Sequence, residues 1–136
     1  MTSRPESLLP EQFGPLQGVR ILSTGTVVAE PFAAALAAEM GAEVVQIERP
    51  GVGDVTRSLS TPIGGQGEPR MNALWLQDRR NTFYTTLDFT VPEGKEMFLR
   101  LIAEADIWME SSKAGTYSNW GLDDATCLAV NPAIVI

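Results

Sequence analysis

Residues 18–57 read GVRILSTGTVVAEPFAAALAAEMGAEVVQIERPGVGDVTR and predict one strand, one loop, one helix and a second strand in succession. The apolar run Val19–Ser23 favours the first strand, and the alanine-rich run Phe32–Met40 favours a helix that stops at Gly41. The β-branched residues of Glu43–Ile47 predict the second strand. Because a helical crossover joins parallel strands of one sheet, this stretch predicts a strand–helix–strand unit.

The rest of the chain predicts further strands and helices in alternation. Asn81–Phe89 is rich in β-formers and predicts a strand or a hairpin leg, while the apolar runs Ile107–Glu110 and Ala133–Ile136 predict two more strands. Pro92 opens a helix with apolar residues at helical spacing, and residues 123–130 predict a shorter helix that begins with aspartate. The alternation predicts an α/β fold, a Rossmann-like open parallel sheet with flanking helices.

Two segments lack such periodicity. Residues 1–17 contain three prolines and predict an extended N-terminal arm, whereas residues 57–70 contain three glycines and two prolines and predict a mobile loop. The chain ends on the bare apolar run AIVI, which as an unpaired edge strand is an aggregation hazard. We therefore expect residues 18–136 to be the truncated front of a longer domain. The alternative is a docked last strand of a small complete protein.

Composition narrows the function classes. A chain of 136 residues with 44% hydrophobic content can bury one modest core, and its net charge of −7 argues against nucleic acid or an anionic membrane as the main partner. There is no histidine, so Ser-His catalysis and histidine metal ligands are excluded. The single Cys127 permits no internal disulfide, which fits a reducing cytoplasm. We interpret its thiol as an unreactive side chain packed in the core. Trp75, Trp108 and Trp120 read as core or interface side chains rather than as stacking partners of adenine.

The loops after the first two strands are the candidate ligand loops. In open α/β sheets a ligand lies outside the carboxyl ends of the strands, which here means Ser23–Glu30 and Glu48–Gly51. Glu48 also stands where a nicotinamide enzyme holds a ribose. The first loop lacks the GxGxxG pattern, however, and this argues against a nicotinamide cofactor.

Four stretches recur together in one known family. They are PLQGVRIL, VVAEPFAAALAAEMGAEVVQIERPGVGDVTR, LDFTVPEGKEMFLRLIAEADIWMESSKAGTYSNWGL and NPAIVI, in that order. The chain thereby resembles the N-terminal part of the class III CoA-transferases, the CaiB/BaiF family. Its SSKAG turn and its Arg79-Arg80-Asn81 run are more similar to the L-carnitine CoA-transferase branch than to the formyl- or oxalate-handling branch. The resemblance implies an interlocked homodimer, a Rossmann-like domain that binds CoA, and an aspartate nucleophile that forms enzyme-bound acyl and CoA-thioester intermediates.

The same resemblance implies CoA contacts at seven positions on segments that follow strands. They are Val28, Ala29, Arg49, Asp88 (at the start of the stretch to Val91), Ser111, Ser112 and Lys113. The chemistry of the residues agrees for Arg49 and Lys113, because cations that follow strands at one sheet edge can meet the phosphates of the CoA nucleotide. The alternatives are that Arg49 pairs with a nearby carboxylate at the surface and that Asp88 merely caps its strand.

Three positions depart from the family pattern. Glu30 replaces the glycine that commonly precedes the helix proline, and it adds negative charge near an anionic cofactor. Thr82 replaces a lysine, and the pair Asn119-Trp120 replaces an arginine. The resemblance also places the nucleophilic aspartate beyond Ile136, so no catalytic residue is assigned within this chain.

We therefore predict the N-terminal CoA-binding portion of a CoA-transferase, which moves CoA from an acyl-CoA donor to a small carboxylic acid. The predicted enzyme is cytoplasmic, acts as an interlocked homodimer or a heteromer, and uses no metal. One alternative is α-methylacyl-CoA racemisation on the same fold, which needs an acid/base pair. The other is a non-catalytic CoA-binding or assembly subunit, which the three departures favour. We expect the 136-residue chain alone to be inactive.

Overall fold

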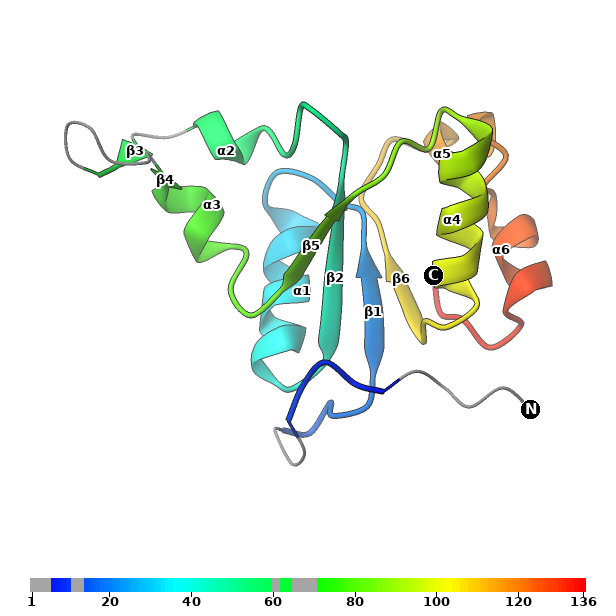
Figure 1. Cartoon of the computed structure of the whole chain (residues 1–136), viewed down its shortest axis with the longest axis horizontal. Coiled ribbons are helices and arrows are strands. Elements are labelled where there is room, and N and C mark those ends of the chain that lie inside the picture. Colours follow the sequence, from blue (N-terminus) through cyan, green and yellow to red (C-terminus); the bar gives the residue numbers. More distant parts are fainter. Residues whose placement is uncertain (1–5, 11–13, 60–61, 65–70) are drawn as a thin grey trace.

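The computed structural model describes residues 6–10, 14–59, 62–64 and 71–136. Its main sheet has four parallel strands, β1 (Arg20–Ser23), β2 (Glu43–Glu48), β5 (Phe83–Thr86) and β6 (Ile107–Met109). Their order across the sheet is β5-β2-β1-β6, with β2 and β1 at the centre (Figure 1). The first four strands of a doubly wound α/β sheet lie in this order. The predicted fold class, an open parallel sheet with flanking helices, is confirmed.

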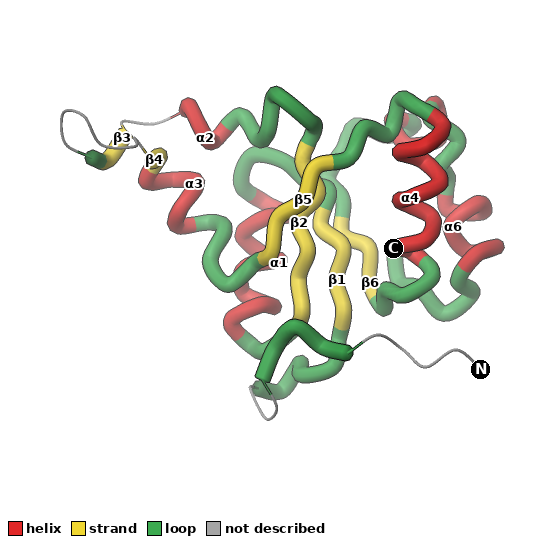
Figure 2. The backbone as a smooth tube through the Cα atoms, in the orientation of Figure 1, coloured by secondary structure: helices red, strands yellow, loops and turns green. Residues whose placement is uncertain are grey.

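The described residues form α1 (Ala29–Glu39), α2 (Thr56–Leu59), α3 (Ala73–Gln77), α4 (Pro92–Ile102), α5 (Thr116–Asn119) and α6 (Asp124–Val130). Helix α1 covers one face of the main sheet, and α4 lies on the other (Figure 1). A short antiparallel pair, β3 (Pro62–Ile63) and β4 (Met71–Asn72), lies with α2 and α3 beyond the β5 edge of the sheet (Figure 2).

The alternation of side chains along β1 divides the core into two layers. Successive strand residues point to opposite faces of a sheet. Ile21 and its partner Val44 on β2 therefore pack against the alanines of α1. Leu22 points the other way, where it shares a cluster with Trp108 of β6 and with Phe98 of α4. The small side chains of α1 bring that helix close to the sheet, while aromatic side chains fill the layer under α4.

Several sequence signals for the ends of helices are confirmed. Pro92 is the first residue of α4, and the Asp123 side chain caps α6 by accepting from the Thr126 N–H at 2.8 Å. Gly41 follows α1 with a φ of 98°, a left-handed conformation that glycine adopts without steric cost. The predicted start of this helix was late, because α1 begins at Ala29 and holds its proline in the first turn. The first N–H groups of a helix have no partner within it, so a proline is tolerated there.

Two strand predictions were wrong in extent. Instead of a strand over Ala133–Ile136, the structure has a single parallel bridge between Ile107 and Val135, in which the Trp108 N–H donates to the Val135 carbonyl at 2.8 Å. The strand predicted over residues 81–89 shortens to β5, which runs parallel to β2 and is no hairpin leg. Asn81 adopts a φ of 57°, and this turn separates β5 from the residues before it.

The mobile loop predicted over residues 57–70 is also wrong for the residues that are described. Residues 57–59 belong to α2, and Pro62–Ile63 pairs with β4. The rest of that loop, residues 60–61 and 65–70, lies outside the described residues, as do residues 1–5 and 11–13 of the predicted arm.

Candidate functional site

A cavity of about 230 Å³ opens at the carboxyl ends of the sheet. Its wall takes residues from the segments after all four parallel strands: Thr24 after β1, Arg49 after β2, Asp88 after β5 and Ser112 after β6. Parallel strands end at one edge of their sheet, so four segments far apart in sequence meet there. The ligand position expected from the sequence therefore coincides with a cavity.

The rim of the cavity carries one cation and one carboxylate from neighbouring strand ends. Arg49 is exposed, and Asp88 is half-buried. The hydroxyl and the N–H of Thr90 donate to Asp88 Oδ1 at 2.6 and 2.9 Å, and these two bonds hold the pKa of Asp88 below its usual range. Asp88 thus caps the turn after its strand and remains charged at neutral pH.

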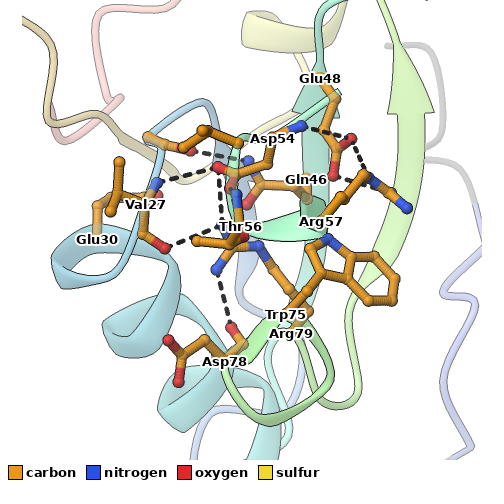
Figure 3. Close-up of polar contacts among 12 residues, drawn as sticks. Val27, Glu30, Gln46, Glu48, Asp54, Thr56, Arg57, Trp75, Asp78 and Arg79 are labelled. Atoms are coloured by element: carbon orange, nitrogen blue, oxygen red, sulfur yellow. Dashed lines mark hydrogen bonds and ion pairs between the residues drawn. The ribbon is translucent and has the colours of Figure 1, made fainter. Parts of the chain in front are cut away.

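Two further carboxylates at the cavity are buried and already paired. Glu48 receives two hydrogen bonds from Arg57, with Nε to Oε2 at 2.7 Å and NH2 to Oε1 at 3.0 Å. The Arg57 guanidinium also lies 4.1 Å from the centre of the Trp75 ring (Figure 3). Asp54 pairs with Arg79 at 3.0 Å. Glu48 is thus engaged on both oxygens, which argues against a role in binding a ribose, and neither carboxylate pairs with Arg49.

Asp54 keeps its charge although it is buried. Burial by itself raises the pKa of a carboxyl, but hydrogen bonds from the hydroxyl and N–H of Thr56 and from the N–H of Val27, together with the charge of Arg79, hold the pKa of Asp54 below its usual range. The Asp54–Arg79 pair therefore joins the loop after β1 to the loop after β2 (Figure 3).

Behind the cavity floor lies a third buried carboxyl, Glu30 of α1. Glu30 Oε2 lies 3.0 Å from the Ser23 hydroxyl, which in turn lies 2.5 Å from Gln46 Oε1. Burial raises the pKa of Glu30 to about 7, against the opposing effects of Ser23 and Arg79. Glu30 is therefore buried and does not line the cavity, so the negative charge that we expected beside the cofactor is not at the cavity wall.

One wall of the cavity is aromatic. Phe89 and Trp120 are stacked with centroids 5.9 Å apart, and Tyr117 meets Trp120 edge to face at 5.4 Å. All three line the cavity. Trp108, in contrast, belongs to the core and donates its indole N–H to the Thr24 hydroxyl at 2.8 Å. The sequence did not single out Phe89 or Tyr117, because their joint position depends on how α5 folds back onto the strand ends.

The seven predicted contact residues divide into two groups. Arg49, Asp88 and Ser112 line the cavity. The others do not: Val28 precedes α1, Ala29 begins it, Ser111 is exposed next to Ser112, and Lys113 lines a separate cavity of about 80 Å³. Contact of any of the seven with CoA stays a prediction.

The cavity lies across the strand ends of a parallel α/β sheet, which is where ligands bind in open sheets of this class. The chain belongs to CoA-transferase family III, whose family model matches residues 16–136. The resemblance stated from the sequence is confirmed.

Three relatives illustrate the match. The beta subunit of succinyl-CoA–L-malate CoA-transferase from Chloroflexus aurantiacus is 37% identical over 90% of this chain and 29% of its own length. The L-carnitine CoA-transferase of Proteus mirabilis is 36% identical over 96% of this chain and 29% of its own length. The crystal structure of a CaiB/BaiF family protein from Brucella suis has a TM-score of 0.83 and 34% identity, covering 91% of this chain and 32% of that one. The chain thus spans about a third of the length of these relatives.

None of the helices in the described part of the chain is long and apolar enough to cross a membrane. No group of three histidine, cysteine or acidic side chains in this part of the chain is arranged to hold a metal ion.

Proposed function

We propose that this chain forms the CoA-binding portion of an enzyme that moves CoA from an acyl-CoA donor to a small carboxylic acid. The observation that carries the proposal is the cavity built from all four strand ends, with the exposed cation Arg49 at its rim, in a chain of CoA-transferase family III. The two buried carboxylates at this edge have their own arginines. Neither of them pairs with Arg49, whose charge interacts with that of the half-buried Asp88 on the same rim, and the exposed guanidinium can still meet a phosphate.

In the proposed mechanism the covalent steps belong to an aspartate outside this chain, and CoA binding belongs to the described residues. An aspartate outside these 136 residues attacks the thioester carbonyl, forms an acyl–aspartyl anhydride and displaces the CoA thiolate, as the resemblance implies. The thiolate then attacks the aspartyl carbonyl, releases the donor carboxylate and forms the enzyme-bound CoA thioester. The acceptor carboxylate attacks this thioester and displaces the CoA thiolate, which then attacks the acceptor's carbonyl, forms the new acyl-CoA and releases the aspartate. The described residues bind and orient the nucleotide end of CoA, and the cavity is far too small for the whole ligand.

The alternatives remain α-methylacyl-CoA racemisation and a non-catalytic CoA-binding subunit. The structure weakens one argument for the second, because Glu30 lies beneath the loop and does not bring its charge into the cavity. The cytoplasmic location and the interlocked homodimer or heteromer are likewise proposals. A relative that carries the name of a beta subunit supports assembly with other chains.

Arg49→Ala is expected to weaken CoA binding by about ten- to a hundredfold in the full-length protein, with almost no change in melting temperature. A charge-assisted hydrogen bond contributes roughly 1.5–3 kcal/mol, and Arg49 is exposed and packs into no core cluster. The measurement is calorimetric titration with CoA, with Lys113→Ala as a second variant. Because Lys113 lines a different cavity, its loss is expected to weaken binding less.

The matched control is Arg100→Ala, which removes an exposed arginine from the last turn of α4, away from the cavity. Its affinity for CoA should equal that of the parent. Equal affinities of Arg49→Ala and Arg100→Ala for CoA would show that Arg49 is a solvated surface charge that does not contact CoA. A parent protein that binds no CoA would overturn the proposed function itself.

A further inference from the structure

The first loop contains a backbone conformation that its sequence does not favour. Val27 has a φ of 70°, in the left-handed region, where a β-branched side chain is a clear outlier. The residue is 40% exposed, so burial of the valine does not compensate for the strain. Some other interaction must hold this residue, because strained residues persist only where their surroundings fix them.

The Asp54–Arg79 ion pair supplies that interaction. Asp54 Oδ2 accepts from the Val27 N–H at 3.0 Å, and the NH2 group of Arg79 approaches the Val27 carbonyl at 3.4 Å. The same NH2 group pairs with the same Oδ2 at 3.0 Å (Figure 3). Both sides of Val27 are therefore held by one ion pair, whose two side chains are each only 1% exposed.

The pair is itself held by the first residue of α2, Thr56. Both the N–H and the hydroxyl of Thr56 donate to Asp54 Oδ1, and Thr56 is fully buried. Arg79 is not fully satisfied in return, since its Nε has no partner among the residues that the structure describes. Burying charges is costly and holding a valine left-handed adds strain, so the arrangement is a poor device for stability alone.

What the arrangement fixes is the direction of the chain just before α1. Val28 returns to a φ of −128° and Ala29 begins the helix, so the N–H groups of the first turn depend on the conformation of Val27. These N–H groups have no partners within the helix and can donate to an anionic ligand. Val28 and Ala29 are also the positions where the resemblance implies contact with CoA.

We infer that Asp54 and Arg79 are positioning residues, whose ion pair, here called the clamp, holds Val27 left-handed and thereby sets the backbone of Val28 and Ala29 against CoA. This inference rests on the proposed function. Neither side chain needs to touch CoA, because the pair acts through the conformation of the residue that it holds.

The test uses glycine, which adopts a positive φ without steric cost. In the full-length protein, Asp54→Asn is expected to weaken CoA binding at least tenfold, because the unclamped valine leaves the left-handed region. Val27→Gly alone should change the affinity by less than about threefold. In the Val27→Gly background, Asp54→Asn should weaken CoA binding by less than about threefold, since glycine reaches the required conformation without the clamp. A merely structural role for Asp54 predicts the same penalty in both backgrounds.

Two more variants keep the test decisive. Val28→Gly is the matched control, since the φ of that valine is negative and glycine there should rescue nothing. Arg79→Lys keeps a charge beside Asp54 but loses the planar fork that spans the carboxylate and the carbonyl, and its binding defect should also be rescued by Val27→Gly. If Asp54→Asn does not fold, Arg79→Lys takes its place in the comparison between the parent and the Val27→Gly background.

The outcomes separate this inference from the proposed function. Binding that is weakened by Arg49→Ala but not by the folded clamp variants would overturn the clamp alone. A clamp penalty of equal size in the parent and in the Val27→Gly background would overturn it as well. A parent protein without affinity for CoA would overturn both. Calorimetric titration with CoA, after thermal melting has shown that each variant is folded, measures every arm.

Discussion

Gly94→Ala is expected to destabilise the protein by more than about 3 kcal/mol, because overpacking typically costs 1–3 kcal/mol and the neighbour here is backbone. A Cβ on Gly94 would lie 1.8 Å from the Asp88 carbonyl oxygen and 2.8 Å from its carbonyl carbon. No rotamer change relieves such a contact, so α4 must move away from the segment after β5. Intrinsic helix propensity acts in the opposite direction, since alanine is favoured over glycine within a helix by about 1 kcal/mol. The sign of the effect therefore reports which term dominates.

The measurement is the free energy of unfolding from urea denaturation. Glu96→Ala is the control, because this exposed residue lies in the same helix and meets no such contact. Its free energy of unfolding should stay within about 0.5 kcal/mol of the parent value. If Gly94→Ala were as stable as the parent or more stable, the close packing of α4 on the segment that carries Asp88 would be wrong.

The sequence predicts the centre of the fold well because local pattern and tertiary role agree there. β1 and β2 are buried on both faces, so their apolar and β-branched runs are strong signals. Gly41, Pro92 and Asp123 act on helix ends through backbone conformation or local hydrogen bonds, which depend little on the rest of the chain. These three signals are therefore visible in the sequence.

The β5 edge is predicted less well because it depends on distant contacts. α2 forms where Arg57 meets Glu48 and the ring of Trp75, two residues on other elements. Its composition, with glycine and proline close behind, indicates only a loop. At the C-terminal end, the short run around Val135 makes one bridge to β6 and does not extend into a strand.

The candidate site divides in a similar way. Arg49 directly follows β2 and Asp88 lies two residues after β5, and residues so close to the end of a parallel strand lie at the edge of the sheet. Lys113 lies farther along its turn, and the chain has already carried it to a different cavity. The clamp on Val27 was invisible, since no pattern in the sequence announces a positive φ at a valine. Glu30 was identified as a departure, but its burial was not foreseen.

Glu30→Gln is expected to stabilise the protein at pH 8 by roughly 2–3 kcal/mol, because burial disfavours the charged carboxylate and Ser23 offsets this only in part. Gln46 Nε2 donates to the Gly25 carbonyl at 3.0 Å, which turns Gln46 Oε1 toward the Ser23 hydroxyl. Ser23 has one proton and two acceptors beside it, Gln46 Oε1 and the Glu30 carboxylate. A protonated Glu30 removes the conflict, because Glu30 then donates to Ser23 and Ser23 donates to Gln46. A glutamine amide makes the same donation at every pH.

The pH dependence gives this prediction its sign. The pKa of Glu30 is about 7 in the folded protein against 4.5 for an ordinary glutamate, so the folded state binds more protons between these values. The stability that protonated Glu30 contributes is complete below about pH 4.5 and is lost as the pH rises through 7. Glu30→Gln should therefore approach the parent near pH 4.5 and exceed it at pH 8 in urea denaturation. Glu39→Gln, which changes an exposed glutamate of the same helix paired with Arg80, should give no gain at pH 8. A parent that equals Glu30→Gln at pH 8 would show that Glu30 ionises without cost, and the proton-sharing arrangement behind the cavity would be wrong.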